Sequence, residues 1–413
     1  MGLPVIRKRV RNYNWRHKYY KKLLILGALV IVVFMGGFFL FFNHSTQKTS
    51  LSTTSAKSPS KPIQTNDTIT FIVSGDEVPH ASVDQNALTA SGSYNFLPFF
   101  SLIKPYMTSA DMSFCNQESP SDPNDAVSGY PTFNAPLSFP QDLQQIGCNI
   151  INLANNHADD KGQAGINATL DEWNSLKSLA VAGTAQSPAE QNQIAFFTVK
   201  GVRFAFLAYA QCSNDQNVSS YGLNIFSQSL AGQQIALAKQ HADMIIAAMH
   251  SCDEDRSTED AWQDATASYF ANQGVDIVVG TGPHWLQPVQ RLPKAGGGTT
   301  IVWYSLGNML STQLDINGLI GGIGVMKIDT NSRKVTFVGF MPTYMHYEWT
   351  AAQKAADDES ARHNLMIYPL DQASVPLSNS QDDTTVETQT VRVTQIMNMY
   401  TPVTMLTSQT FPL

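Results

Sequence analysis

Positive charge is scarce in this sequence once its first 22 residues are set aside. The 413 residues include 26 lysines and arginines against 33 aspartates and glutamates. Eight of those cations precede residue 23, which leaves 18 against 33 acids and a formal net charge of −15 for the rest. Nucleic-acid binding needs a basic surface that displaces counterions, so the composition argues against nucleic acid as a partner. An acidic surface also repels polyanions, so an anionic substrate needs a metal ion or local cations to hold it.

Charge is also missing from the apolar run Leu23–Phe42, and no small-x-small cleavage motif follows it at Asn43-His44-Ser45. At about 1.5 Å per residue, a helix of this length spans roughly 30 Å, the hydrocarbon thickness of a bilayer. The run is therefore predicted to be an uncleaved transmembrane anchor at 23–42, with a cleaved signal peptide as the alternative. The basic segment 1–22 is expected to be cytoplasmic, which places the large domain outside the cell membrane. Its cations are Arg7, Lys8, Arg9, Arg11, Arg16, Lys18, Lys21 and Lys22.

Residues 43–66 have little apolar content and are rich in Ser, Thr, Lys and Pro, which predicts a flexible linker. From residue 67 to about 345, strand-like and helix-like segments alternate, which predicts one large α/β domain with a mainly parallel inner sheet. Helical periodicity is clearest at Gly165–Leu179 and in a segment with Ser257 as candidate N-cap that stops at Gly274. Residues 346–413 form a C-terminal extension with no predicted role.

Only four cysteines occur, and in an exported domain they allow two disulfides in three pairings. Cys115 and Cys148 lie in consecutive strand-like runs, while Cys212 and Cys252 both follow such runs. The predicted pairs are therefore Cys115 with Cys148 and Cys212 with Cys252. The alternative is four buried free thiols, and Cys252 is also a candidate metal ligand because it is two residues from His250.

Five apolar runs end at side chains that can bind metal. In an open parallel sheet, ligands bind beyond the carboxyl ends of the strands, so these positions are expected to meet at one rim. Carboxylate, amide and imidazole donors suit manganese, zinc or iron. Each residue alone is more simply a turn former, but the recurrence favours a shared metal or phosphate site. The five positions are Asp76, Asn116 to Glu118, Asn155 to His157, His250 and His284.

Several short motifs, in this order, resemble the bacterial CapA/PgsA capsule-synthesis family, whose members support poly-gamma-glutamate production and have the calcineurin-like metallophosphatase fold. The resemblance covers roughly residues 67–343. It implies a metallophosphatase-like layered α/β sandwich preceded by one transmembrane helix. The motifs are Ser74-Gly75-Asp76, Asn116-Gln117-Glu118, Leu153-Ala154-Asn155-Asn156-His157 with Asp160 and Gly162, Ala182-Gly183, Pro283-His284-Trp285-Leu286-Gln287-Pro288 and Tyr304-Ser305-Leu306-Gly307-Asn308.

The same resemblance implies roles for individual residues. His157 and Asn156 are the implied catalytic pair, with His157 as the acid that protonates a leaving oxygen or binds its developing charge. Glu254 matches the glutamate of a His-x-Gly-x-Glu segment in which Cys252 replaces the glycine. The implied metal ligands are Asp76, Glu118, Asn156, His250 and His284, and the implied supporting residues are Asn116, Asn155, Asp160, Glu254 and Asn308.

Two departures from the metallophosphatase pattern reduce the expected metal content. Val78 stands where the first strand end normally has a histidine, and Gly282 stands where the last has one. Two missing imidazoles predict one divalent ion rather than two, and Gly282→His is expected to raise the occupancy. His80 is a possible substitute ligand, with a plain loop residue as the alternative.

The leading hypothesis is a membrane-anchored extracytoplasmic protein that supports synthesis, export or attachment of a capsule or envelope polymer such as poly-gamma-glutamate. Its expected partners are membrane-embedded polymer-synthesis subunits, an anionic envelope polymer, and the membrane itself through the N-terminal helix. One alternative is a metal-dependent phosphoesterase or amide hydrolase on an envelope substrate. The other is a non-catalytic polymer-binding scaffold with a degraded metal site.

Overall fold

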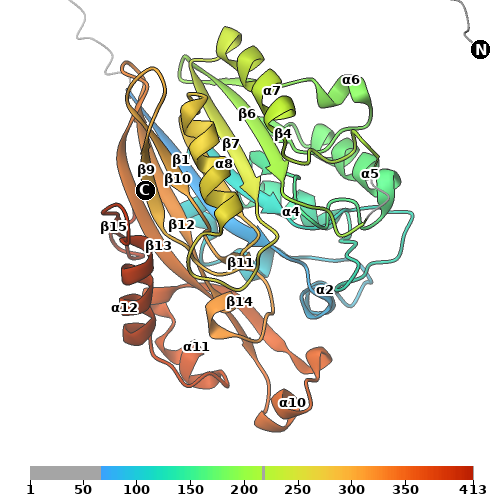
Figure 1. The fold of residues 1–413 in the computed structure, drawn as a ribbon. Coiled ribbons are helices and arrows are strands. Elements are labelled where there is room, and N and C mark those ends of the chain that lie inside the picture. The colour runs from blue at the N-terminus through green and yellow to red at the C-terminus, as the bar shows by residue number, and fades with distance from the viewer. Residues whose placement is uncertain (1–66, 216–218, 413) are drawn as a thin grey trace, which may run out of the picture. The chain divides into compact units, whose positions relative to one another are not determined.

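Two β-sheets packed face to face form the framework of the protein (Figure 1). The computed structural model describes residues 67–215 and 219–412, which belong to one unit, Thr65–Leu413. The predicted anchor at 23–42 and linker at 43–66 lie outside the described residues. Within the described ranges, no helix is long and apolar enough to cross a membrane.

The first sheet has nine strands and is mixed. Its order is β14-β13-β12-β1-β2-β3-β4, with β11 beside β1 and β15 beside β13. The half from β1 to β4 is parallel, while β12 is antiparallel to β1 and to β13, β13 is antiparallel to β14, and β15 is parallel to β13. The strands are β1 (Thr68–Glu77), β2 (Met112–Gln117), β3 (Ile150–Asn152), β4 (Ala180–Ala182), β11 (Asn308–Leu310), β12 (Ile320–Asp329), β13 (Lys334–Glu348), β14 (His363–Pro369) and β15 (Thr404–Met405).

The second sheet has six strands in the order β5-β6-β7-β8-β10-β9. Its four inner strands are parallel and its two edge strands are antiparallel. The expectation of an α/β fold is thus confirmed, and the mainly parallel arrangement holds for the strands that carry the site. The strands are β5 (Ala195–Val199), β6 (Val202–Ala210), β7 (Met244–His250), β8 (Ile277–Thr281), β9 (Val289–Pro293) and β10 (Thr299–Trp303).

The core lies between the two sheets, where alternate strand residues face each other. Phe114 of β2 meets Phe206 of β6 with ring centroids 6.0 Å apart, and Trp303 of β10 meets Phe340 of β13 at 6.3 Å. Gly324 of β12 allows close approach of the sheets, because a Cβ there would lie 2.9 Å from the Trp303 ring of β10. The sheets are therefore held in a fixed relation, which fixes the positions of their strand ends.

Helices cover the outer faces of both sheets. On the second sheet, α7 (Gln228–His241) lies over β6 and β7, and α8 (Ala261–Asn272) lies over the strands from β7 to β9 (Figure 1). On the first sheet, α5 (Gly162–Ser175) buries Trp173, whose indole N–H donates to the Gln117 side chain at 2.7 Å. The other helices are α2 (Ala81–Ala87), α3 (Lys104–Met107), α4 (Ser138–Gln145), α6 (Pro188–Gln191), α9 (Ile316–Leu319), α10 (Ala351–Ala355), α11 (Ser374–Asn379) and α12 (Val386–Met397), with 3₁₀ turns η1 (Leu97–Phe100), η2 (Glu359–Ala361) and η3 (Leu370–Gln372).

The start of α8 corrects a detail of the sequence prediction. The N-cap is Asp260 rather than Ser257, because Asp260 and Gln263 form a reciprocal capping box. The Asp260 carboxylate accepts from the Gln263 backbone N–H at 2.7 Å, and the Gln263 side chain accepts from the Asp260 N–H at 3.0 Å. Ser257 therefore lies in the preceding loop.

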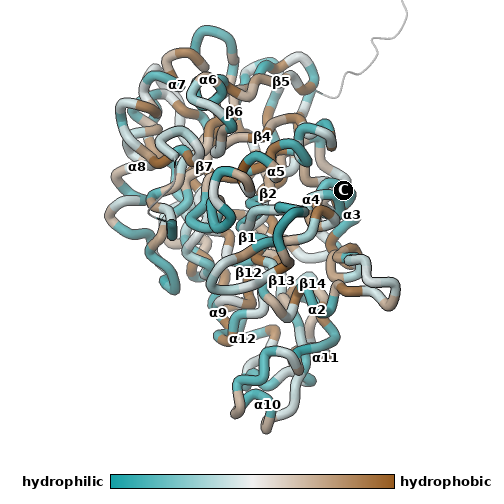
Figure 2. Tube along the Cα trace, turned by 90° about the vertical axis from the view of Figure 1, so that its right-hand side faces the viewer, coloured by the Kyte–Doolittle hydropathy of each residue, from teal (hydrophilic) through white to brown (hydrophobic). Residues whose placement is uncertain are grey.

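The C-terminal residues pack on the first sheet. β13 runs past residue 345 to Glu348. β14 pairs with β13 from Thr343 to Glu348, and β15 pairs with Gly339 and Phe340 of β13. Figures 1 and 2 place α10 at the opposite end of the unit from α6 and α7. The loop between α10 and β14 contains η2, and η2 contacts α2, the helix that follows β1.

Candidate metal centre

The carboxyl ends of strands from both sheets converge on one buried cluster. It contains Asp76 at the end of β1, Glu118 after β2, Asn156 after β3, His250 at the end of β7 and His284 after β8. All five side chains are buried, with at most 6% of any residue exposed. The structure therefore brings together all five residues that the sequence analysis proposed as metal ligands.

Asp76 lies at the junction of the two sheets. Its carboxylate accepts hydrogen bonds from the Asn116 amide at 2.8 Å and from the Gly282 backbone N–H at 3.1 Å. Asn116 is itself fixed by Asn152 of β3, whose amide donates to the Asn116 side-chain oxygen at 2.8 Å. Asn152 was not singled out from the sequence, although it ends an apolar run in the same way as the predicted residues. These bonds fix the Asp76 carboxylate in one orientation.

Glu118 provides the test of whether the cluster suits a cation. Its Oε1 atom is buried and has no hydrogen-bond partner. One ligand atom each from Asp76, Glu118 and His250 can be chosen so that all three lie within 4.8 Å of one another. A buried carboxylate oxygen without a donor is costly unless a cation binds it, so this donor set fits a divalent ion.

His250 is oriented through both ring nitrogens. Nδ1 lies 2.9 Å from the Thr281 hydroxyl, and Nε2 lies 2.9 Å from the Asn156 side-chain oxygen. Because the Asn156 side-chain oxygen can only accept, Nε2 is the nitrogen that donates to it, and Thr281 fixes the ring from behind with Nε2 directed at the cluster.

His284 is held in an unusual backbone conformation. Its φ is +60°, a left-handed value that is rare for a residue with a side chain. Nδ1 lies 2.9 Å from the Asn308 side-chain oxygen, which leaves Nε2 facing Glu118 Oε1 at 3.7 Å. Nδ1 also lies 3.3 Å from Asp76 Oδ2, so both ring nitrogens face carboxylates of the cluster, and Asn308 helps to orient the ring.

Burial and mutual charge shift the protonation of these groups. Burial raises the pKa of Glu118 well above its ordinary value. Burial opposes a charge on His284, but the Glu118 and Asp76 carboxylates outweigh that effect and raise its pKa to about 10. Burial lowers the pKa of His250 to about 3, which leaves its ring neutral at pH 7 and able to donate a lone pair to a metal. The carboxylates thus favour a nearby positive charge, which protonated His284 supplies in the metal-free cluster and which a divalent cation would increase.

The surroundings of Gly282 leave no room for the histidine that the metallophosphatase pattern has at this position. Its φ is +98°, and a Cβ at this position would lie 2.1 Å from the Ser251 carbonyl oxygen and 2.9 Å from His250 Nε2. The Gly282 N–H donates to Asp76, so the backbone lies against the carboxylate. The expectation that Gly282→His raises metal occupancy is therefore wrong, because no side chain fits there.

The other missing imidazole is not replaced either. Val78 is buried, and its backbone N–H donates to the Leu310 carbonyl at 2.8 Å. His80 accepts from the Thr312 N–H at 3.3 Å and packs edge-on against Phe133. Within the described ranges, no hydrogen bond or ion pair joins His80 to a carboxylate of the cluster, and burial with nearby positive charge lowers its pKa to about 3. His80 thus lies beside the cluster as part of a wall.

His157 lies next to the cluster and has its own carboxylate partner. Its Nδ1 lies 2.8 Å from Asp160 Oδ2, which also accepts from the Phe133 N–H at 2.7 Å. The Phe133 ring meets the imidazole edge-on, with centroids 4.6 Å apart. Asn155 fixes the loop, because its amide donates to the Gln117 carbonyl at 2.8 Å and its oxygen accepts from the His157 N–H at 3.2 Å. The predicted residues Asn155, His157 and Asp160 are therefore mutually positioned.

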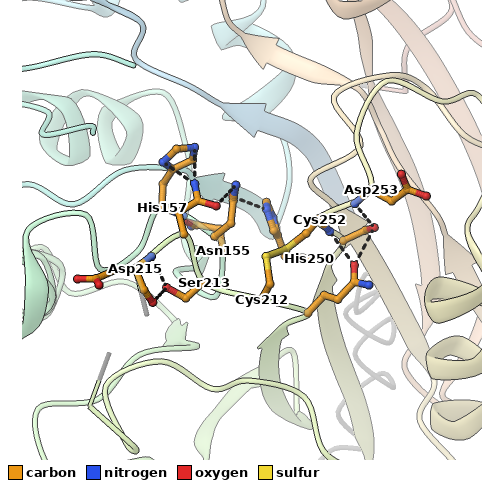
Figure 3. Close-up of a disulfide and its surroundings, with 12 residues drawn as sticks. Asn155, His157, Cys212, Ser213, Asp215, His250, Cys252 and Asp253 are labelled. Atoms are coloured by element: carbon orange, nitrogen blue, oxygen red, sulfur yellow. Dashed lines mark hydrogen bonds between the residues drawn. A yellow bond between two sulfur atoms is a disulfide. The ribbon is translucent and has the colours of Figure 1, made fainter. Parts of the chain in front are cut away.

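A disulfide between Cys212 and Cys252 joins the loops that follow β6 and β7, with Cα atoms 6.3 Å apart (Figure 3). The first loop carries Asn214, whose amide lies 3.3 Å from either ring nitrogen of His157. Asn214 was also missed from the sequence, because no pattern links it to His157. Cys115 and Cys148 form the second bond, with Cα atoms 5.7 Å apart, so both predicted pairs occur and Cys252 is not free to bind metal.

A cleft of about 330 Å³ opens beside the cluster. Its wall includes Glu118, His157 and His284, and also Glu254 of the β7 loop. Arg362, from the C-terminal extension, completes the wall. Sequence reasoning gave Arg362 no role, since nothing in its local sequence indicates that it reaches this cleft.

Residues 70–313, more than half of the chain, match the family described as bacterial capsule synthesis protein PGA_cap. The PGA biosynthesis protein CapA of Bacillus subtilis (strain 168) is 29% identical over 175 residues, which cover 41% of this chain and 44% of that protein. The capsule biosynthesis protein CapA of Bacillus anthracis is 28% identical over 181 residues, which cover 41% of this chain and 42% of that protein. The match thus spans less than half the length of these relatives.

Among solved structures, a phosphatase from Mycoplasma pneumoniae is 14% identical, with a TM-score of 0.42 over 67% of this chain and 93% of that one. The protein TT1561 of Thermus thermophilus is 11% identical, with a TM-score of 0.37 over 65% and 98%. The 5'-nucleotidase of Candida albicans SC5314 is 11% identical, with a TM-score of 0.35 over 66% and 54%.

Proposed function

Because this chain belongs to the bacterial capsule synthesis protein PGA_cap family, we propose that it supports synthesis, export or attachment of a capsule or envelope polymer such as poly-gamma-glutamate. The names of two relatives, a PGA biosynthesis protein and a capsule biosynthesis protein, support this proposal. The polymer class remains part of the proposal because the matched region is less than half of each relative.

The proposed location is the cell membrane, with residues 1–22 cytoplasmic, an anchor at 23–42 and the domain outside. Eight cations on one side of an uncharged apolar run support this orientation. Two disulfides within the domain also support it, since such bonds persist in oxidising compartments. The proposed partners are membrane-embedded polymer-synthesis subunits and an anionic envelope polymer. Protease added to intact cells should remove the domain, and a protected domain would contradict the orientation.

The proposed cofactor is one divalent ion, manganese, zinc or iron. The observation that carries it is the unpartnered Glu118 Oε1 within reach of Asp76 and His250. Asp76, Glu118 and His250 would hold the ion, with Asn156 and His284 beside them. A bound divalent ion supplies positive charge that polarises an acyl or phosphoryl group and lowers the pKa of water.

A hydrolase acting on a phosphoester or amide of the envelope is the second candidate function. The contact between His157 and Asp160, 2.8 Å long and at the edge of the metal cluster, favours it. Asp160 fixes the orientation of the His157 ring, which would place the ring to give a proton to a leaving oxygen or nitrogen. In a purely structural protein, such a pair beside a cleft would need another explanation.

Elemental analysis of the purified full-length chain tests the metal proposal. We expect close to one divalent ion per chain, and loss of that ion in Asp76→Asn, which removes a carboxylate at the centre of the cluster. Complementation of a strain lacking the gene tests the polymer role, with Asp76→Asn expected to reduce polymer yield. A metal-free wild-type chain that still restores polymer would reject the metal centre and leave a binding scaffold.

A further inference from the structure

Arg362 is a buried cation whose binding edge is unused. Only 3% of the residue is exposed, yet its Nε and Nη2 atoms have no hydrogen-bond partner. Nη1 donates to the Thr312 carbonyl, so one corner of the guanidinium is fixed. Nε and Nη2 together form the side of the guanidinium that donates two parallel hydrogen bonds to a carboxylate or phosphate.

The surroundings hold this side chain in place without satisfying its donors. The guanidinium carbon lies 4.8 Å from the Trp349 ring centroid and 5.2 Å from that of Tyr347. The Asn86 amide donates to the Arg362 carbonyl at 2.8 Å, which ties the residue to α2. The guanidinium is therefore stacked and oriented before any ligand arrives, a condition that lowers the entropic cost of binding.

Two carboxylates approach the free edge without closing it. Asp357 and Glu359 each lie 3.8 Å from Nη2, and both side chains are more than half exposed. That distance exceeds a hydrogen bond, and exposed ion pairs contribute little, so neither residue explains the buried donors. A ligand entering the cleft would compete with them at small cost.

The position of Arg362 connects it to the candidate metal centre. It lines the same cleft as Glu118, His157 and His284. The domain is acidic overall, so an anionic substrate needs local positive charge, and Arg362 supplies it in the cleft that Glu118 and His284 also line. The residue lies outside the region 70–313 that matches the family, so the C-terminal extension adds it to the site.

We propose that Arg362 is a substrate-binding residue that anchors an oxyanion, a carboxylate or a phosphate, through paired hydrogen bonds from Nε and Nη2 while the adjoining substrate bond faces the metal centre. This proposal rests on the proposed function, because it takes the cleft to be the substrate site. It gives the C-terminal extension a role in selecting anionic substrates.

The test uses the full-length chain, with and without added manganese, and two probes. A γ-linked triglutamate represents the carboxylate source, and inorganic phosphate represents the phosphate source. Arg362→Lys keeps the positive charge but loses the paired donors Nε and Nη2. We therefore expect binding of at least one probe to weaken by about 10- to 100-fold with metal content unchanged. Loss for triglutamate alone identifies a carboxylate, loss for phosphate alone identifies a phosphate group, and loss for both supports a general oxyanion site.

Arg392→Lys is the matched control. Arg392 in α12 is also partly buried with unpartnered Nη atoms, but it does not line this cleft, so its replacement should change neither affinity by more than about twofold. Glu359→Gln provides a second test that does not depend on whether Arg362→Lys folds. Removing this exposed competitor should strengthen probe binding by about two- to fivefold.

Three outcomes would overturn the proposal: unchanged binding in Arg362→Lys, no strengthening in Glu359→Gln, or no millimolar binding of either probe by the wild type. The metal proposal is read separately. A chain without metal that still shows the Arg362 effect would reject the metal centre alone, while a loaded chain without the effect would reject the role of Arg362 alone.

Discussion

Oε1 of Glu118 lies 3.7 Å from Nε2 of His250, so the two atoms face each other without a hydrogen bond. A buried carboxylate in this position costs stability in the metal-free protein and adds affinity when a cation binds. Function and stability are therefore opposed at this residue.

Glu118→Gln should separate these two effects. The neutral amide removes the cost of burying an unpartnered carboxylate, so the metal-free variant should unfold at a higher temperature, by a free energy of about 1–3 kcal/mol. The rise in melting temperature that manganese produces in the wild type should disappear. Calorimetry with and without metal measures both, and Glu387→Gln, an exposed change in α12 away from the cleft, is the control. A full manganese response in Glu118→Gln would show that the ligands lie elsewhere.

Gly282→His should lower metal binding, although the family pattern alone favours the opposite. The new Cβ would lie 2.1 Å from the Ser251 carbonyl and would displace the N–H that donates to Asp76. Even Gly282→Ala should cost several kcal/mol of unfolding free energy, on the order of the largest single-residue effects. Gly92→Ala is the matched control, since Gly92 has φ +82° but a Cβ there meets nothing within 4 Å. Gly92→Ala should lower the free energy of unfolding by about 1 kcal/mol. Equal losses in the two alanine variants would contradict the steric explanation.

Asp84 predicts a pH dependence of stability that is unrelated to the metal. Both carboxylate oxygens are buried without hydrogen-bond partners, and burial raises the pKa to about 8. The folded protein therefore keeps a proton that the unfolded chain releases above about pH 4. The contribution of Asp84 is fully present below that pH and is lost progressively as the pH rises to about 8.

Asp84→Asn should remove this loss, because the amide stays neutral at every pH. Its gain over the wild type should be small at pH 5 and reach a few kcal/mol, as an order of magnitude, at pH 8. Urea unfolding at the two pH values measures the difference, and the exposed change Asp358→Asn is the control. A gain that does not grow with pH would mean that Asp84 is ionised in the folded protein.

The convergence of Asp76, His250 and His284 could be predicted from the sequence for a simple reason. Parallel strands end at one edge of their sheet, and short apolar runs followed by a polar ligand mark those ends. Asp160 and Asn155 were found because they belong to the same short motif as His157. Local pattern and one topological rule were sufficient for these residues.

Arg362, Asn214 and the steric closure at Gly282 could not be predicted in the same way. Each depends on contacts between residues far apart in the chain, such as Arg362 with Thr312 or Gly282 with Ser251. The sequence shows only that position 282 lacks a histidine. The structure shows that the backbone of Ser251 occupies the space that a side chain at position 282 would need. The antiparallel half of the first sheet could not be predicted either. The end of β13 and the whole of β14 lie beyond residue 345, where the sequence has only weak strand periodicity.

His157→Ala should abolish any phosphoesterase or amidase activity of the full-length chain while leaving its metal content unchanged. Within the described ranges, the His157 ring contacts Asp160, Asn214 and Phe133 and makes no hydrogen bond to a ligand of the proposed ion. Asp160→Asn should be milder, with a loss of about 10²- to 10⁴-fold, because the ring loses the partner that orients it. His363→Ala, an exposed change in β14, is the control for both. If His157→Ala also removes the metal, the imidazole is a ligand rather than a proton donor, and the hydrolase mechanism given for it is wrong.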